Sequence, residues 1–461
     1  MPPAGGNAER PAAAVELIRA HLCPYVNYAR LLIDGHCVLP ALLRDLEEAR
    51  QSIHVAMFLF FRDPIGEEIA SALARKAADG VAVRVLLNLE KTHMGDPFST
   101  GERRMIRHDP SVHHDPTDVG PLGTWMRAHG IEVVDSNIDY DHVIEVRDPR
   151  LRSLAAQIRD TIAVDDLHID HRKIIVIDGR VAYCGGANIG AQYLFHEPFD
   201  PGKDSRIEGE ERKRRRLPEP WWKWHDSLTR FEGPVAGELD KHFRDRWILD
   251  GGRDYAAKEP IAAEPRGRPI RRAEVLLNEP NDQPNEVRER YVELIRGARE
   301  SIFIENPYLY HPAIVEALLA AKSARPTLRI DLVLPARKWN DNSFAHDAQQ
   351  HPYARYLAAG IAVHEYQNHF NHLKTAAFDG RFSVHGSTNL NYRSLENDKD
   401  FELVVCVEDE GLAQEVLTRV RDVDIRACKH FTQRDVRGLR GRLRVRTRDP
   451  RTLFLLSRKV L

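Results

Sequence analysis

The chain has 461 residues, more than one hydrophobic core usually serves, so we expect two domains or two fused halves of roughly 200 residues each. With 42% hydrophobic and 30% charged residues, the composition is that of a globular protein and excludes intrinsic disorder as the default state. The formal charge of -2 argues against a protein that binds polyelectrolytes over its whole surface.

The cysteines and the N-terminal sequence indicate in which kind of compartment the protein works. The five cysteines are scattered, odd in number and without a CxxC pair, so neither a disulfide framework nor a zinc site is indicated and a reducing compartment fits best. Residues 1–30 lack the basic start and apolar core of a signal peptide, and no run of about 18 uncharged apolar residues occurs. We therefore expect a soluble or membrane-peripheral protein with an N-terminal extension over 1–30.

The first predicted elements alternate between helix and strand. An amphipathic helical pattern over 41–48 leads into a buried strand within 49–60. A second helical pattern over 65–80 then precedes a β-branched strand over 81–88. Such alternation predicts an α/β fold in which helices cover a parallel or mixed sheet.

The same order of elements returns 249 residues later. The segment 298–309, ARESIFIENPYL, is similar to 49–60, ARQSIHVAMFLF, and it also follows an amphipathic helical pattern. A helical pattern over 311–324 and a strand over 327–335 follow it. The chain therefore contains an internal duplication.

We assign 31–255 to a first half and 270–428 to a second half. Two insertions interrupt the first half: 91–166, rich in His, Asp, Pro and Gly, predicts an elaborated loop, and 198–220 is highly charged. Residues 429–461 hold eleven Lys and Arg against two acids and form a basic C-terminal tail.

A second pair of similar segments carries the chemistry. HRKIIVIDGRVAYCGGAN begins at His171 and HLKTAAFDGRFSVHGSTN begins at His372, 201 residues later. On a strand, a His and a Lys two residues apart share one face. The Asp-Gly pairs at Asp178 and Asp379 are signals of hairpin turns.

The residue types in these segments suit a phosphate group, because lysine and asparagine donate hydrogen bonds and glycine lets the backbone approach closely. A lone histidine near a strand is more often structural, but a buried lysine needs a partner and two complete copies are present. We predict one active site with the catalytic set His171, Lys173, Asp178, His372, Lys374 and Asp379. The predicted phosphate-binding residues are Asn188, Asn389 and Ser387, the last as a hydroxyl on the phosphate side and not as a nucleophile.

These two motifs resemble those of the phospholipase D superfamily, and both copies are complete. The flanking segments are most similar to the bacterial cardiolipin synthase branch, notably GHCVLPALLRDLEEARQSIHVAMFLF, GGANIGAQYL, WHDSLTRFEGPVAGELDKHFRDRW and GSTNLNYRS. The similarity covers roughly 31–407 apart from the insertions. It implies two similar phospholipase D-like halves, each a mixed β-sheet flanked by helices, packed with pseudo-twofold symmetry about one cleft.

The resemblance also implies roles for the motif residues. One histidine attacks phosphorus to give a phosphohistidine and the other protonates the leaving alcohol; the resemblance favours His171 as nucleophile and His372 as general acid, and the reverse stays open. The lysines and asparagines would neutralise phosphoryl charge, and no metal or other cofactor is required. Although they are motif members, we interpret Asp178 and Asp379 as structural residues of the turn.

By the same resemblance, a carboxylate downstream of each motif orients each histidine. We assign Asp226 in WHD to His171, and Glu402 in DFELVV to His372. The segment between the second motif and DFELVV is two residues longer than is usual, so Glu396 is an alternative.

Three further features have competing interpretations. The first insertion holds His and Asp residues that suggest a metal ion, but they lack the i, i+4 spacing of helical ligands and we predict no metal site; they are His108, Asp109, His113, His114 and Asp115. The basic tail suits either an anionic membrane surface or a solvated edge strand. The run ERKRRR at 211–216, followed by PEPWWKW, is either a second membrane contact or a charged loop.

The sequence thus predicts an enzyme that transfers a phosphatidyl group, with phosphatidylglycerol as donor and acceptor and cardiolipin as product. Hydrolysis is the same chemistry with water as acceptor. We expect an anionic phospholipid substrate, no nucleic acid, a monomer, and a cytoplasmic location at the inner face of the plasma membrane. The alternatives are a nucleic-acid or other soluble phosphodiesterase, although the sequence shows no aromatic-basic binding module, and a non-catalytic membrane adaptor, which would predict an eroded motif.

Overall fold

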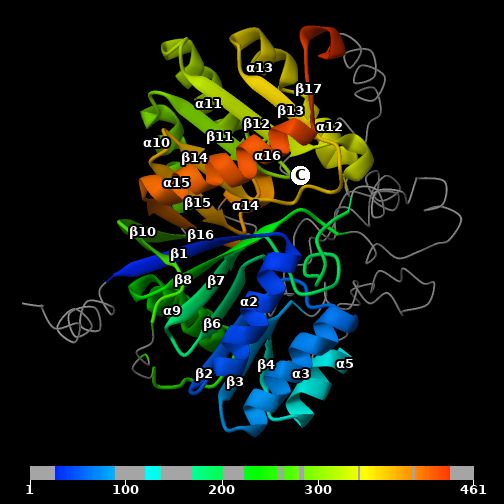
Figure 1. Ribbon diagram of the computed structural model, residues 1–461, viewed down its shortest axis with the longest axis vertical. Helices are drawn as coiled ribbons and strands as arrows, with labels where there is room; N and C mark the ends of the chain where they lie inside the picture. The colour runs from blue at the N-terminus through cyan, green and yellow to red at the C-terminus, as the bar shows by residue number, and fades with distance from the viewer. Residues whose placement is uncertain are drawn as a thin grey trace, which may run out of the picture.

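The chain folds into two halves, each built on one β-sheet (Figure 1). The computed structural model describes residues 26–88, 120–136, 169–200, 223–257, 260, 264–279, 285–340, 343–396 and 400–436. The strand order is β4-β3-β2-β6-β7-β8-β1-β9 in the first sheet and β10-β16-β15-β14-β11-β12-β13-β17 in the second, where β5 also pairs with β16.

The first half contains the elements β1 (Asn27–Ile33), α2 (Gly35–Glu48), β2 (Ser52–Met57), α3 (Pro64–Ala78), β3 (Ala82–Leu87), α5 (Gly120–Ala128), β4 (Glu132–Asp135), β5 (Ile169–Asp170), β6 (Lys173–Ile177), β7 (Val181–Gly185), β8 (Ser227–Glu232), α9 (Pro234–Leu249) and β9 (Arg268–Ile270). Helix α3 shows why such segments form where they do. The Asp63 carboxylate accepts a hydrogen bond from the Gly66 N–H at 2.9 Å, and Pro64 occupies the first helical position.

The second half contains β10 (Arg272–Asn278), α10 (Glu286–Gly297), β11 (Ser301–Glu305), α11 (Pro312–Ala324), β12 (Arg329–Pro335), η3 (Arg337–Trp339), α12 (Ser343–Gln350), α13 (Tyr353–Ala359), β13 (Ala362–Tyr366), β14 (Thr375–Phe378), β15 (Phe382–Gly386), α14 (Tyr392–Leu395), β16 (Asp400–Glu408), α15 (Glu410–Val416), the π-helix η4 (Leu417–Arg421), α16 (Asp422–Asp424), η5 (Ile425–Ala427) and β17 (Cys428–His430). Strand β17 pairs with β13, and the buried side chains of Phe431 and Val436 join the core of this half. The basic segment after residue 436 lies outside the described residues.

The strand order confirms the duplication. The series β4-β3-β2-β6-β7-β8-β1 of the first sheet corresponds to β13-β12-β11-β14-β15-β16-β10 of the second. In each series the first three strands are parallel and the motif hairpin pairs with them antiparallel. Both halves are therefore mixed sheets flanked by helices, as the sequence predicts.

One expectation about the first half is wrong. The range 91–166, predicted as a loop, contains α5 and β4, and β4 pairs in parallel with β3 as β13 does with β12. A four-residue edge strand gives too short an alternation to be recognised in sequence. The rest of the range 91–166, including His108, Asp109, His113, His114 and Asp115, and residues 201–220 of the second insertion lie outside the described residues.

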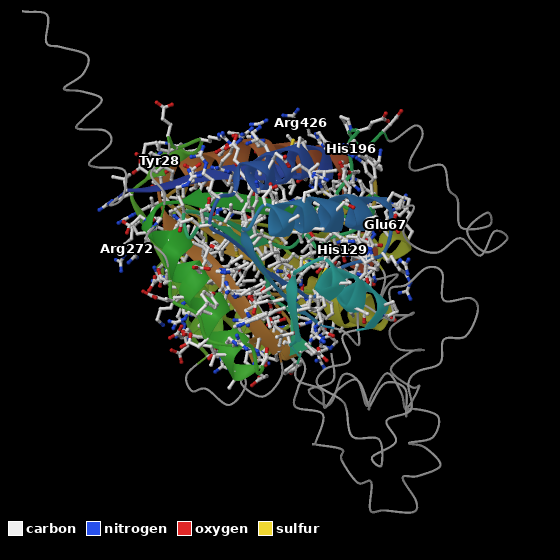
Figure 2. The ribbon with its side chains drawn as sticks, turned by 90° about the horizontal axis from the view of Figure 1, so that it is seen from below. Tyr28, Glu67, His129, His196, Arg272 and Arg426 are labelled. Atoms are coloured by element: carbon white, nitrogen blue, oxygen red, sulfur yellow. The ribbon has the colours of Figure 1, made fainter. Side chains whose placement is uncertain are left out.

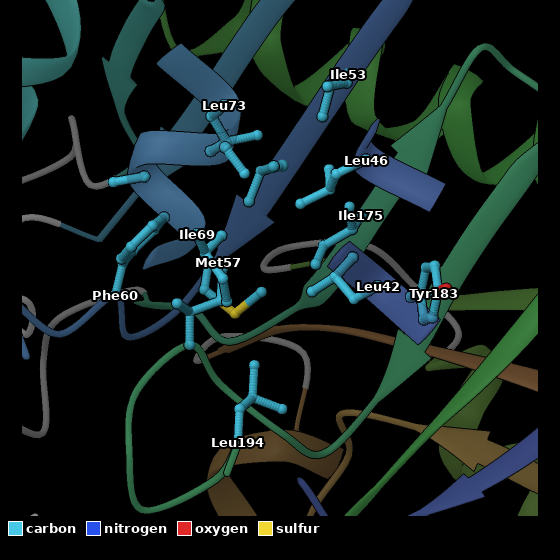
Figure 3. Close-up of a cluster of buried hydrophobic side chains, with 14 of the residues drawn as sticks. Leu42, Leu46, Ile53, Met57, Phe60, Ile69, Leu73, Ile175, Tyr183 and Leu194 are labelled. Atoms are coloured by element: carbon cyan, nitrogen blue, oxygen red, sulfur yellow. The ribbon is translucent and has the colours of Figure 1, made fainter. Parts of the chain in front are cut away.

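Alternating side chains of the strands supply two kinds of core. In β6, Ile175 and Ile177 point toward α2 and α3, where Figure 3 shows Ile175 beside Leu42 and Met57. Ile174 and Val176 point the other way, into a central core that unites apolar residues of both sheets with α9 and α15. This shared central core fixes the two halves against each other.

The chain also crosses between the halves at two places. Strand β5 leaves the first half to pair in parallel with β16, so that Asp170 lies opposite Phe401. An isolated bridge joins His225 to Asn371 in the same way. In the described ranges, no helix combines the length and apolar character needed to cross a bilayer.

Candidate active site

Each motif begins a hairpin whose Asp-Gly turn is anchored to the neighbouring strand. Asp178 and Asp379 have positive φ angles of 53° and 52°, as a type I′ hairpin turn requires. The Asp178 carboxylate accepts hydrogen bonds from three successive backbone N–H groups at 50–52, at 2.7 to 3.2 Å. Asp379 does the same for 299–301 at 2.8 to 3.0 Å. This geometry agrees with a structural role for both aspartates.

The two histidines are held by buried carboxylates, but the partners are exchanged relative to the sequence prediction. Nδ1 of His171 lies 2.8 Å from Oε1 of Glu402, and Nδ1 of His372 lies 2.6 Å from Oδ2 of Asp226. The predicted pairing of Asp226 with His171 and of Glu402 with His372 is therefore wrong. Each histidine-carboxylate pair joins one half to the other.

The crossing of the chain explains the exchange. His171 directly follows β5, and its N–H donates to the carbonyl of Phe401 at 3.0 Å. The His372 N–H donates to the carbonyl of His225 at 2.8 Å. In both cases the residue after the acceptor carries the carboxylate, so the backbone pairing between halves decides which acid meets which histidine.

The surroundings of Glu402 correct a second expectation. Its carboxylate accepts hydrogen bonds from the hydroxyls of Ser387 and Ser394, the latter at 2.5 Å. Ser387, predicted as a hydroxyl on the phosphate side, thus holds the carboxylate that holds His171. The alternative acid, Glu396, lies 3.1 Å from His311 instead.

Asp226 depends on a glycine of the first motif. A Cβ atom at Gly186 would lie only 2.3 Å from Oδ1 of Asp226, so no larger residue fits there without moving the carboxylate. Oδ1 also accepts a hydrogen bond from the Ser227 N–H at 2.7 Å. The close approach that the sequence predicts for this glycine therefore admits a carboxylate.

The two lysines are buried beside the histidines. Nζ of Lys173 donates to the His171 carbonyl at 2.6 Å, and Nζ of Lys374 donates to the His372 carbonyl at 2.8 Å. Burial is the main reason why the pKa of Lys173 falls to about 7, and the positive charge of Lys374 acts in the same direction. A bound anion would favour the charged form of both lysines, so the pair suits an anionic substrate.

The two histidine-carboxylate pairs differ in charge. Burial lowers the pKa of His171 and holds the pKa of His372 well below its ordinary value, where Lys374 and Lys173 add to the effect. Burial raises the pKa of Asp226 to about 7. For Glu402, burial raises the pKa but His171 and Lys173 outweigh it, so the net shift is downward. Near neutral pH, Glu402 is therefore ionised, whereas the Asp226 carboxyl gains and loses a proton in this pH range.

The motif asparagines have different surroundings. Oδ1 of Asn188 accepts a hydrogen bond from the Leu59 N–H at 3.1 Å, which leaves the NH2 group as its donor. Oδ1 of Asn389 is buried without a hydrogen-bond partner among the described residues. Turning this amide by 180° would present a donor at the same place.

Aromatic residues that the sequence analysis did not predict surround both histidines. The rings of Phe58 and His171 are 4.7 Å apart, and Trp224 and Tyr193 lie 5.1 and 5.6 Å from His372. Trp224, grouped in sequence with a membrane contact, is only 6% exposed and belongs to the site wall. Its place two residues before Asp226 was the available signal.

One buried cluster could hold a metal by composition. Ligand atoms of His225, Glu305 and Asp424 lie within 4.8 Å of one another. However, His225 contacts Asp34 through Nδ1 at 2.7 Å and Asp424 through Nε2 at 3.0 Å. Although burial opposes it, these carboxylates raise the pKa of His225 well above its ordinary value, and a protonated imidazole cannot ligate a metal. We interpret the cluster as an ion-pair network between the halves.

Two histidines with buried carboxylate partners, beside two buried lysines, form a site suited to chemistry on a phosphate ester. The family model described as "Cardiolipin synthase, PLD-like domain" matches residues 42–197 and 291–422. The chain belongs to this family and is a phospholipase D-type enzyme, which confirms the resemblance.

Individual relatives agree. The chain is 24% identical over 411 residues to cardiolipin synthase 1 of Bacillus anthracis, covering 88% of this chain and 67% of that protein. It is 25% identical over 401 residues to cardiolipin synthase A of Yersinia pseudotuberculosis, covering 86% and 68%. The structure of phosphatidylserine synthase from Haemophilus influenzae Rd KW20 is similar at a TM-score of 0.53 and 14% identity, covering 90% of this chain and 91% of that one. That likeness concerns the fold alone.

Proposed function

We propose that this enzyme transfers a phosphatidyl group through a phosphohistidine intermediate, with phosphatidylglycerol as donor and acceptor and cardiolipin as product. The observation that carries the proposal is the pair of crossed histidine-carboxylate contacts, which brings both motifs into one buried site. The names of the relatives support the choice of substrate.

In the first step, Nε2 of His171 attacks phosphorus, and the bond between phosphorus and the oxygen of the headgroup glycerol breaks. The leaving oxygen takes a proton from His372, and Asp226 shares that proton through the 2.6 Å contact. Glu402 stabilises the positive charge that develops on His171.

In the second step, the hydroxyl of a second phosphatidylglycerol gives its proton to His372 and attacks phosphorus. The bond between phosphorus and Nε2 breaks, and His171 is regenerated. Lys173, Lys374, Asn188 and Asn389 stabilise the phosphoryl charge in both steps, and substrate binding keeps Lys173 protonated. Water in place of the alcohol would give phosphatidic acid.

We also propose that the enzyme is a monomer that works on the cytoplasmic surface of the membrane, where its lipid substrate lies. Phe58 and Trp224 would exclude water from the phosphohistidine and thereby favour the alcohol. The lipid headgroup would then enter a site in which Phe58, Tyr193 and Trp224 lie beside the histidines.

The test is to incubate the wild type and His171→Ala with phosphatidylglycerol vesicles and to follow lipids and glycerol by mass spectrometry. His129→Ala is the matched control, because His129 is an exposed histidine in the turn directly after α5 (Figure 2). We expect cardiolipin and glycerol from the wild type and His129→Ala and neither from His171→Ala. If phosphatidic acid is the sole lipid product, the enzyme is a hydrolase and not a transferase. Turnover by His171→Ala would show that the proposed site is wrong.

A further inference from the structure

A cavity of about 310 Å³ lies at the seam between the two halves, apart from the two motif histidines. Strand β1 and helix α2 line it from the first half, and α15 with the π-helix η4 lines it from the second. Figure 2 shows α2 and the helices that lead to Arg426 along one face of the molecule. The polar residues that line the cavity are Arg30, His36, Cys37, Arg44, Glu415 and Arg419.

The lining carries an excess of positive charge. Nη1 of Arg419 donates to Oε1 of Glu415 at 2.5 Å and to the Leu31 carbonyl at 3.1 Å, so that its guanidinium is both fixed and partly neutralised. Arg30 and Arg44 are exposed and form no ion pair with any residue in the described ranges. Two positive charges therefore face this cavity without a counter-charge.

His36 adds a polar atom that lacks a partner. Nε2 of His36 lies 3.4 Å from Sγ of Cys37, whereas Nδ1 is buried and has no hydrogen-bond partner among the described residues. Leaving a buried polar group without a partner is unfavourable, so a ligand that accepts a hydrogen bond from this ring would be stabilised. An accepting ligand would thus meet both this imidazole and the arginines.

The second half contributes an unusual backbone. Arg419 lies in the middle of η4, Leu417–Arg421, which is a π-helix and not a regular α-helix turn. Short π-helical segments are rare and occur often at functional sites. Here η4 carries Arg419, the arginine that the second half adds to Arg30 and Arg44 of the first half.

We propose that this cavity is a second phosphate-binding site, separate from the two-histidine site. A guanidinium offers paired donors that match phosphate oxygens, and two uncompensated charges balance a phosphate group. The volume suits the phosphate and glycerol of an anionic headgroup, or a soluble phosphoester, but not an entire lipid or a nucleic-acid strand. The proposal requires no turnover and is independent of the proposed reaction.

Cys37 provides a readout inside the cavity. It is a free thiol of intermediate burial, and Cys428 is a second free thiol of the same class outside the cavity. The rate of alkylation of each cysteine is measured by peptide mass spectrometry, with and without ligand, in the His171→Ala background so that lipid is not consumed. The probes are sn-glycerol 3-phosphate, vesicles of phosphatidylglycerol and vesicles of phosphatidylcholine.

We expect ligand to slow alkylation of Cys37 about tenfold at about ten times its Kd and to leave Cys428 unchanged. The double variant Arg30→Ala/Arg44→Ala should lose this protection. The single variant Arg44→Ala should lose part of it. The control Arg296→Ala/Arg299→Ala removes two exposed arginines of the second half and should keep it.

The probes separate the two sources of phosphate. Protection by phosphatidylglycerol vesicles alone assigns the cavity to a lipid headgroup, and equal protection by sn-glycerol 3-phosphate assigns it to a soluble phosphoester. The proposal is overturned if neither probe protects Cys37, if phosphatidylcholine protects equally, or if Arg30→Ala/Arg44→Ala keeps full protection.

Discussion

The crossed contacts predict that Glu402 and Asp226 serve different chemical steps. Glu402 contacts the proposed nucleophile His171, and Asp226 contacts the proposed acid His372. Glu402→Gln and Asp226→Asn keep the shape of each side chain and remove one charge-assisted hydrogen bond. Such a bond contributes about 1.5–3 kcal/mol, so each variant should lose about 10- to 150-fold in rate on phosphatidylglycerol.

A substrate with p-nitrophenol as the leaving group separates the two effects, because nitrophenolate departs without a proton. On that substrate Asp226→Asn should regain most of its rate, since the acid is no longer needed. Glu402→Gln should stay impaired, because attack by His171 still requires its carboxylate. Release of nitrophenol is followed by absorbance, and released glycerol reports on the natural substrate.

Trapping the phosphohistidine and mapping it by mass spectrometry identifies the nucleophile independently. The assignment of Glu402 to attack and of Asp226 to protonation is refuted if the phosphate is found on His171 and yet Glu402→Gln, not Asp226→Asn, is rescued by the nitrophenyl substrate. Phosphate on His372 with that same pattern would instead keep the contacts and reverse the two roles.

Four further outcomes are expected. Lys173→Met should abolish turnover yet stabilise the protein by up to about 5 kcal/mol at pH 7. The reason is that, between pH 10.5 and pH 7, the lysine of the unfolded chain takes up a proton that the buried lysine does not. Urea unfolding should show a much smaller gain in stability at pH 10, and an equal gain at both pH values would refute the lowered pKa. Asp178→Ala should cost about 3 kcal/mol in urea unfolding, since it strips the acceptor from three backbone N–H groups, whereas lost turnover at full stability would place Asp178 in the chemistry. His225→Gln should lower the free energy of unfolding by about 3–5 kcal/mol below pH 6.5. This loss should shrink as the pH rises through the raised pKa of His225, and a loss that does not change with pH would contradict a charged histidine. Cys184→Ala should keep kcat, because this buried thiol has its pKa raised to about 12 by burial, and a large loss of kcat in the folded variant would contradict that.

The duplication shows what sequence alone can determine about the fold. The two similar segments at 49–60 and 298–309 mark the same strand in each sheet, and the two motifs mark the same hairpin. Periodicity and turn signals are local, so they predict these elements well. A short edge strand such as β4 lacks that local signal, and its place depends on pairing with β3.

The histidines, lysines and aspartates of the site were likewise predictable, because each lies at a fixed spacing within one motif. The sequence could also name Asp226 and Glu402 as carboxylates near the histidines, but it assigned each to its own half. Only the tertiary structure decides the pairing, since β5 crosses to β16 and carries His171 to Glu402. Contacts between segments more than 140 residues apart depend on how two surfaces pack, and no local pattern encodes that packing.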